Sequence, residues 1–372
     1  MSAMRTVRLG DVAELQAGVG FPLTLQGRST GDYPFAKVGD ISDAGRAGKI
    51  TLSAATHFID EGDLNKLRAK PIPPGATLFA KIGEAIRQNH RVRAGCPILI
   101  DNNAMAAIPG PNLDGQFLFR YLQSVDFYRL TSSTTVPALR KSELQQLPIP
   151  FPPLSEQKRI ADILDKADAL RTQRRATLAR LDELTQSIFL NMFGDPVINP
   201  KGWPRWTFDQ TIRDETAKSE KLQKSDYLPT GAHPVIDQGQ SVVAGYCDDD
   251  KFLCKSELPL VVFGDHTRVV KLVKSPFVVG ADGAKVLVPQ HQVGATYLSF
   301  LLEHLPIPDL GYSRHMKEVK RLAFPIPPLA LQEEFAARVS HADRHRVKLE
   351  RALAICDGLF ASLQHRAFSG TL

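Results

Sequence analysis

The sequence predicts an α+β protein in which two mixed α/β domains alternate with two long helices. The first observation is an internal repeat, because residues 152–157 (PPLSEQ) return as residues 327–332 (PPLALQ). The offset of 175 (327 − 152) then continues without a gap to Phe193 and Phe368. The second observation is a change of composition. Glycine, proline and β-branched residues are frequent before each motif, and apolar residues recur with helical periodicity after it. Repeats spaced this widely are duplicated domains, so we expect an internal pseudo-two-fold repeat.

The repeat divides the chain into four segments. We expect a first domain at 1–148, a proline strap with a long helix at 149–197, a second domain at 198–323, and a second strap and helix at 324–372. The turn-rich composition of both domains predicts many short strands.

A proline strap precedes each helix. Residues 147–154 (LPIPFPPL) contain prolines that fix the backbone and remove hydrogen-bond donors, which predicts extended chain. Ser155 is expected to cap the following helix, with Glu156 in its first turn. The second copy has Ala330 and Leu331 at these positions, so we expect packing to hold its first turn instead.

Both helices carry an apolar stripe with the alternating four-three spacing of a coiled coil. The stripes are interrupted at one matched place, by Arg171 and by Arg346. Two helices with the same seam in one chain are expected to pack on each other, while an intermolecular coiled coil remains the alternative. The expected seam residues are Ile160, Leu164, Leu178 and Leu181 in the first helix, and Phe335, Val339, Leu353 and Phe360 in the second.

The two domains match more loosely than the helices. Residues 83–87 (GEAIR) align with residues 264–268 (GDHTR), and the first domain carries roughly nineteen extra residues between Phe35 and Gly83. Two domains that diverged while the helices kept their register are expected to recognise different ligands.

Composition limits the class of protein. The chain has 372 residues, 43% hydrophobic content and a net charge of +6, which permits a polyanionic partner without requiring one. No apolar run is long enough to span a membrane, and the N-terminus shows no secretion signal. The four scattered cysteines are expected to be reduced thiols, so we expect a cytoplasmic protein.

The motifs together resemble a specificity subunit of Type I restriction-modification enzymes. The resemblance rests on residues 136–142 running into 147–157, on residues 312–317 running into 327–332, and on residues 262–268 and 280–283. It implies two target-recognition domains that each read half of a bipartite site in double-stranded DNA. It also implies that the two helices form an antiparallel coiled coil, which sets the separation of the domains.

The resemblance implies partners as well. Two modification subunits that methylate adenine with S-adenosylmethionine would dock on the helices, with two translocase-nuclease subunits where restriction is present. The specificity subunit itself would perform no chemistry and hold no cofactor.

Basic side chains are the candidates for DNA contact, since they bind phosphates and guanine edges. In one group, Arg87 and Arg268 follow a glycine-acid turn in each domain; the alternative is that they pair with Glu84 and Asp265 and brace their loops. In a second group, basic residues precede each strap, where a solvated loop is the alternative. The first group comprises Arg87, Arg268, Lys81, Arg91 and His266, and the second Arg140, Lys141, Arg314, His315 and Lys317.

Catalytic motifs would favour a competing interpretation, in which the chain is an enzyme. A phosphate-binding loop and an adenine-methyltransferase motif are absent from the sequence. Asp265 with residues 282–285 (DGAK) could hold Mg²⁺ in a nuclease, but the spacing has one residue too many and the first domain lacks the lysine. We predict no metal site. A protein-interaction scaffold with duplicated domains and, behind it, a Mg-dependent nuclease remain the alternatives.

Overall fold

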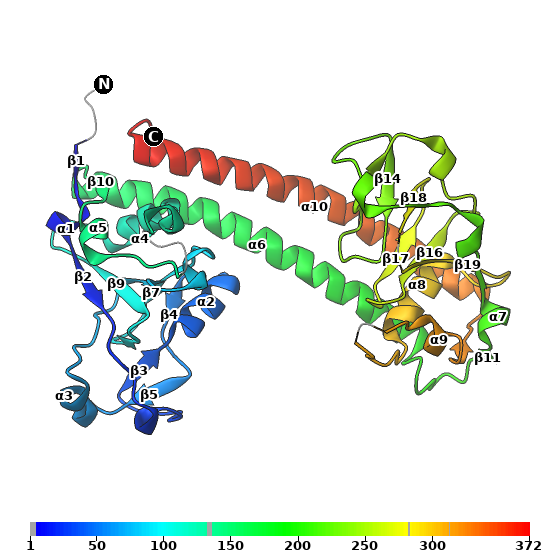
Figure 1. Cartoon of the computed structure of the whole chain (residues 1–372), viewed down its shortest axis with the longest axis horizontal. Coiled ribbons are helices and arrows are strands. Elements are labelled where there is room, and N and C mark those ends of the chain that lie inside the picture. Colours follow the sequence, from blue (N-terminus) through cyan, green and yellow to red (C-terminus); the bar gives the residue numbers. More distant parts are fainter. Residues whose placement is uncertain (1–4, 132–135, 282, 312) are drawn as a thin grey trace. The chain divides into compact units, whose positions relative to one another are not determined.

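The computed structural model describes residues 5–131, 136–281, 283–311 and 313–372. It divides into two compact units, one of residues 1–175 with 351–372 and one of residues 176–350. Each unit contains one mixed domain and parts of both long helices (Figure 1). Because the division cuts the helices, it does not mark where a domain begins, and the boundaries expected above stay predictions.

The first unit contains two main sheets. The larger has the order β2-β9-β6-β7-β4 and the smaller β5-β3-β8. A short antiparallel pair, β1 with β10, joins the start of the chain to the proline strap. The strands are β1 (Thr6–Arg8), β2 (Ala13–Ala17), β3 (Tyr33–Ala36), β4 (Thr51–Leu52), β5 (His57–Ile59), β6 (Thr77–Ala80), β7 (Arg91–Ala94), β8 (Leu99–Ile100), β9 (Ala104–Pro109) and β10 (Pro148–Pro150).

Short helices pack on the two sheets of this unit. The longest is α4, which begins where the Asp114 side chain accepts hydrogen bonds from the backbone N–H groups of Gln116 and Phe117, a regular N-cap. Its face, with Phe117 and Leu122, is buried in the main apolar core of the unit. The helices are α1 (Leu9–Val12), α2 (Val38–Arg46), α3 (Leu64–Leu67), α4 (Gly115–Ser124) and α5 (Lys141–Gln145).

The second unit repeats this plan. Its sheets have the orders β12-β19-β16-β17 and β13-β18-β14-β15, and α8 takes the place of α4. The strands are β11 (Arg205–Trp206), β12 (Ile212–Asp214), β13 (Lys221–Leu222), β14 (His233–Ile236), β15 (Gly245–Cys247), β16 (Leu260–Gly264), β17 (Val270–Val273), β18 (Val278–Gly280), β19 (Ala284–Pro289) and β20 (Phe324–Pro325), and the helices α7 (Phe208–Thr211), α8 (Ala295–His304) and α9 (Met316–Val319).

The strand orders confirm that the domain is duplicated. The first four strands of the large sheet in one unit correspond in order to β12-β19-β16-β17 in the other. Between β3 and β5 the first unit inserts α2 and β4, whereas residues 237–244, between β14 and β15, contain no helix or strand. This insertion accounts for most of the extra residues expected after Phe35.

The strand register corrects the alignment of the two domains. Ala80 pairs with Ala104 in the first unit, and Gly264 pairs with Ala284 in the second. Lys81 therefore corresponds to Asp265, and the match of Gly83 with Gly264 is wrong by three residues. The cause is the turn between the paired strands, which covers residues 81–90 in the first domain and only 265–269 in the second.

The two long helices are confirmed as α6 (Leu154–Phe193) and α10 (Leu329–Ser369). In the first unit, Ile160 near the start of α6 shares a core with Ala367 near the end of α10. In the second, Phe189 near the end of α6 packs edge-on against Phe335 near the start of α10, with ring centroids 5.6 Å apart. Within each unit the helices are thus antiparallel, as Figure 1 also shows.

The burial of the residues between α6 and α10 differs along the two helices. Ile160, Leu164, Phe335 and Val339 are buried because the domains cover them as well. The other four expected seam residues are only half-buried, as a two-helix contact leaves them; they are Leu178, Leu181, Leu353 and Phe360.

Both helices begin in the same way. The Pro153 carbonyl accepts hydrogen bonds from the N–H groups of Glu156 and Gln157, and the Pro328 carbonyl accepts the equivalent bonds in α10. Ser155 thus lies inside the first turn and is not the N-cap that the sequence predicted. The replacement of Ser155 by Ala330 therefore removes no cap.

No helix among the described residues is long and apolar enough to cross a membrane.

Candidate nucleic-acid interface

The turn after β6 and the segment before α5 form one surface of the first unit. The Leu139 N–H donates to the Lys81 carbonyl at 2.8 Å, and the Gly83 N–H donates to the Pro137 carbonyl at 2.8 Å. These bonds bring together Lys81 and the pair Arg140–Lys141, which the sequence placed in separate groups.

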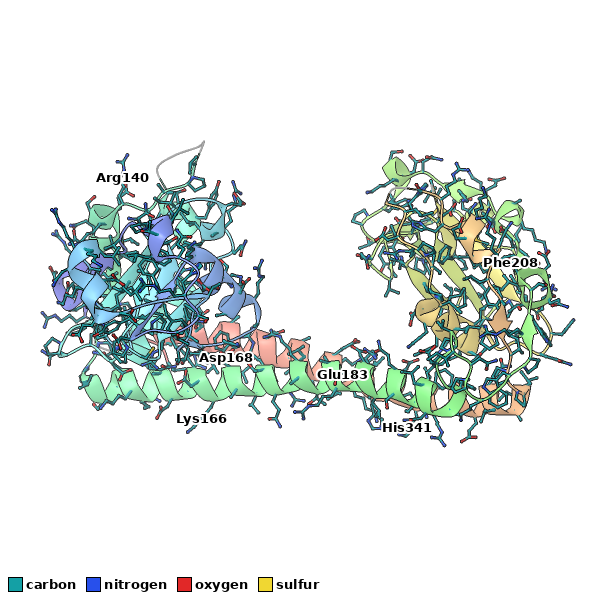
Figure 2. The ribbon with its side chains drawn as sticks, turned by 90° about the horizontal axis from the view of Figure 1, so that it is seen from below. Arg140, Lys166, Asp168, Glu183, Phe208 and His341 are labelled. Carbon is teal, nitrogen blue, oxygen red and sulfur yellow. The ribbon has the colours of Figure 1, made fainter. Side chains whose placement is uncertain are left out.

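This surface carries positive charge with few partners. Arg140 is exposed, and the nearest carboxylate, Glu143, is 3.9 Å from its guanidinium. Lys81 and Lys141 have no ion pair with any residue that the structure describes. Figure 2 shows Arg140 on the side of its unit opposite α6.

Arg87 lies on the same turn but is partly engaged. Its guanidinium is 3.0 Å from the Glu84 carboxylate and stacks over the Tyr128 ring at 3.9 Å. The bracing contact with Glu84, one of the two alternatives for this residue, is thus present. The side chain keeps 51% of its surface exposed, so its outer edge remains accessible.

Arg91 is corrected from a DNA-contact candidate to a core residue. It is only 4% exposed, and its guanidinium lies 3.7 Å from the centre of the Phe127 ring. Burial lowers the pKa of this guanidinium to about 9. Its NH2 group donates to the Asn89 side chain at 2.7 Å, which ties β7 to the turn before it and keeps the charge away from solvent.

The second unit builds the corresponding surface around a buried carboxylate. Asp265 is 2% exposed, and one of its side-chain oxygens accepts the Met316 N–H at 2.7 Å. Its carbonyl accepts the His315 N–H at 2.8 Å. The turn after β16 is thereby fastened to the segment before α9, as in the first unit.

His315 is corrected as well. The ring is 1% exposed, and its Nδ1 lies 2.8 Å from the Asp265 carbonyl. The Leu310 N–H donates to its Nε2 at 3.2 Å. Both ring nitrogens are thus used to fold the loop, and neither reaches the surface.

The neighbours of His315 remain candidates. Arg314 and Lys317 are exposed, and neither has an ion pair within the described part of the chain. His266 lies beside them, with Nδ1 3.2 Å from the Ser313 carbonyl. The second domain therefore also brings its two predicted groups together.

Arg268 is not the counterpart of Arg87. It lies two residues before β17, as Asn89 lies two residues before β7, and both have positive φ, 60° and 52°. Arg268 donates to the Ile307 carbonyl at 3.1 Å and pairs with Asp309 at 2.6 Å, rather than with Asp265.

Asn89 makes an equivalent link to the loop after α4, because its side chain accepts the Phe127 N–H. At this position both residues hold the turn against the loop that follows the helix. Arg268 is therefore weakened as a candidate for DNA contact.

The nuclease interpretation gains no support from this region. Asp282 lies outside the described residues. The Asp265 carboxylate is occupied by the Met316 N–H, and Lys285 Nζ lies 3.8 Å from it. Among the described residues no group of three or more His, Cys, Asp or Glu side chains could hold a metal ion.

Two exposed amide side chains that the sequence did not predict as contact residues lie beside this surface in the first unit. Asn102 and Asn103 form the turn before β9, and the Lys81 N–H donates to the Asn103 carbonyl at 2.8 Å. Asparagine side chains can read adenine, so these residues belong to the candidate surface. The only sequence feature that could have indicated these two residues is that they are consecutive asparagines, and this pattern alone indicates a turn.

Part of the chain matches a known protein family. Residues 1–180 match the family model described as Type I restriction modification DNA specificity domain. A stretch of 166 residues is 28% identical to a putative type I restriction enzyme specificity subunit of Haemophilus influenzae, and covers 44% of this chain and 37% of that protein. A stretch of 89 residues is 34% identical to the Type I restriction enzyme EcoDI specificity subunit of Escherichia coli, and covers 22% of this chain and 20% of that protein. The matches thus span well under two thirds of these relatives' lengths.

Two solved structures are similar over nearly the whole chain. The Type-I restriction-modification S subunit from M. genitalium superposes with a TM-score of 0.61 at 14% identity, and covers 98% of this chain and 96% of its own. A chain from a structure on complex assembly of the type I R-M system superposes with a TM-score of 0.54 at 18% identity, and covers 100% of this chain and 99% of its own. At these identities the likeness concerns the fold.

Proposed function

We propose that this chain is a type I restriction-modification specificity subunit, because residues 1–180 match the model of that DNA specificity domain, and that it reads the two halves of a bipartite site in double-stranded DNA. The observation that carries the proposal is the duplicated surface, in which the turn after β6 or β16 is fastened to the segment before α5 or α9. Each copy presents exposed basic residues, with Arg140 and Lys141 in one and Arg314 and Lys317 in the other.

The two surfaces would make different contacts. Lys81 in the first domain corresponds to the buried Asp265 in the second, so one copy adds a positive charge where the other has a structural carboxylate. In the first domain the Lys81 N–H donates to the carbonyl of exposed Asn103, which follows exposed Asn102. Such differences support independent readers, because base choice depends on a few side chains while phosphate contacts supply affinity.

We also propose that the helices dock adenine-methylating modification subunits, with translocase-nuclease subunits where restriction is present. Three large apolar side chains on each helix are 42–72% exposed, and exposed apolar surface is a feature of protein interaction sites. They are Leu170, Leu184, Leu190, Val347, Ile355 and Leu359. In this proposal the chain performs no chemistry itself and works in the cytoplasm, where its DNA is.

The DNA surface is tested by salt-dependent binding of the full chain to a duplex. We expect log affinity to fall linearly with log salt. Replacing Arg140, Lys141 or Lys317 singly by alanine is expected to reduce the slope by about one for each phosphate that the side chain neutralises.

Lys166→Ala is the matched control, because Lys166 points from α6 away from the domain in Figure 2. An affinity that is insensitive to salt, or slopes that fall no more in the three variants than in the control, would favour the protein-interaction scaffold instead.

A further inference from the structure

Two histidines on α10 lie one helical turn apart on an exposed face. His341 and His345 are both exposed, and Figure 2 shows His341 pointing from the helix away from the domain of its unit. Their rings are 4.8 Å apart between centroids, with the two Nε2 atoms 3.1 Å from each other. This pair was missed when no metal site was predicted, although four-residue spacing places two side chains on the same face of a helix.

We propose that His341 and His345 form a surface site for a divalent transition metal such as Zn²⁺, Ni²⁺ or Cu²⁺. Imidazole nitrogen suits these ions. Two metal–nitrogen bonds of about 2.1 Å to atoms 3.1 Å apart subtend an angle of about 95° at the metal. That angle is close to the right angle between neighbouring ligands in octahedral or square-planar coordination, so the rings need little movement.

The surrounding side chains permit this arrangement. Arg344 Nη2 lies 3.4 Å from His341 Nδ1, while its Nη1 donates to Ser340 Oγ at 3.1 Å. A metal on Nε2 places the imidazole proton on Nδ1, so Arg344 gives up the longer contact and keeps the bond to Ser340. No third His, Cys, Asp or Glu completes the site among the described residues. Water or a side chain of a docked partner would fill the remaining positions.

The equivalent positions of the other repeated helix lack histidines. At the offset of 175, His341 and His345 correspond to Lys166 and Leu170 of α6, which are also exposed. A cation and an apolar side chain do not bind a metal, so of the two repeated helices α10 carries the pair and α6 does not.

The test uses the untagged full chain and Ni²⁺ alone. We expect the wild-type chain to be retained on immobilised Ni²⁺ and to gain thermal stability when free Ni²⁺ is added, because an ion that binds the folded state stabilises it. His341→Ala and His345→Ala should each lose the retention and the stabilisation, while His365→Ala, which removes another histidine of α10, should keep both.

Transplanting the pair makes the test reciprocal. Lys166→His combined with Leu170→His, in a chain that also carries His341→Ala, should restore retention from α6. Equal retention of the wild type and of the His341→Ala and His345→Ala variants would overturn the proposal, as would a wild-type chain that Ni²⁺ neither retains nor stabilises.

Discussion

At the residue scale, two buried glutamines explain why the proline motif repeats. Gln157 accepts the Asp114 N–H at 2.8 Å and donates to the carbonyls of Asn112 and Pro152. Gln332 accepts the Gly294 N–H at 2.8 Å and donates to the carbonyls of Gln292 and Pro327. Each glutamine therefore joins the strap, the first turn of a long helix and the loop before α4 or α8. The sequence showed that the motif repeats, but only the bonds show why a glutamine must end it.

Removing one of these glutamines should unfold its unit more easily. Gln157 is 1% exposed, so Gln157→Ala leaves three backbone groups without a hydrogen-bond partner in the protein interior. The free energy of unfolding is expected to fall by about 2–4 kcal/mol. The measurement is the urea midpoint of the full chain followed by circular dichroism. Gln146→Ala is the control, since Gln146 is exposed on the same unit. Equal midpoints for the two variants would show that the triple contact is not needed.

The residue scale is also where sequence reasoning failed most. Arg91 and His315 are basic residues near a turn, and nothing in their local pattern distinguishes a buried donor from a surface contact. Their burial depends on Phe127 and Asp265, which lie far away in sequence. The alignment of Arg87 with Arg268 was wrong because the two turns differ in length, so residues of the same type do not occupy equivalent positions.

At the element scale, the shared interruption of the two stripes is a reciprocal ion pair. In the first unit Arg171 of α6 lies 2.6 Å from Asp357 of α10. In the second unit Arg346 of α10 pairs with Asp182 of α6. The offset of 175 relates both the two arginines and the two aspartates. The sequence predicted both helices and their matched breaks, but the partner of each arginine required the antiparallel pairing.

The Arg171–Asp357 pair gives a testable dependence on pH. The hydrogen bond from Arg171 is the main cause that lowers the pKa of Asp357. The folded state therefore binds this proton less tightly than the unfolded state. The stabilisation is present above the unfolded pKa and is lost as the pH falls through the folded pKa. Asp357→Asn should thus be less stable at pH 7, by under about 1 kcal/mol for a half-exposed pair.

Urea midpoints at two pH values check this expectation. The difference between wild type and Asp357→Asn should be largest at pH 7 and should shrink toward pH 3. A difference that stays constant or grows on acidification would mean that the ion pair does not stabilise the contact of α6 with α10.

At the scale of the whole molecule, the duplication was the most readable property of the chain. An uninterrupted offset along two helices predicted two copies of one architecture, and the matching strand orders confirm it. The number of strands and the insertion of α2 and β4 could not be predicted, because short strands in turn-rich sequence have little periodicity. Nor could the proposed DNA target be predicted, because the loops that would contact it differ between the two domains.

If the helices act as a spacer between two readers, their length should set the gap in the DNA site. Inserting four helix-forming residues after Gln173 adds one turn, about 6 Å, to α6. We expect the gap between the two recognised half-sites to lengthen by about one or two base pairs, because successive pairs are about 3.4 Å apart along the duplex. The half-sites themselves should not change, since neither domain is altered.

A genome-wide map of methylated adenines, in cells that express the chain with the modification subunits proposed to dock on it, measures the gap and the half-sites. The control replaces Gln173 by alanine without an insertion, which preserves the length of α6. Methylation at the original gap by the lengthened chain would contradict the spacer. Altered half-sites at an unchanged gap would instead mean that the helix contributes to base choice, because the insertion changes nothing in either domain.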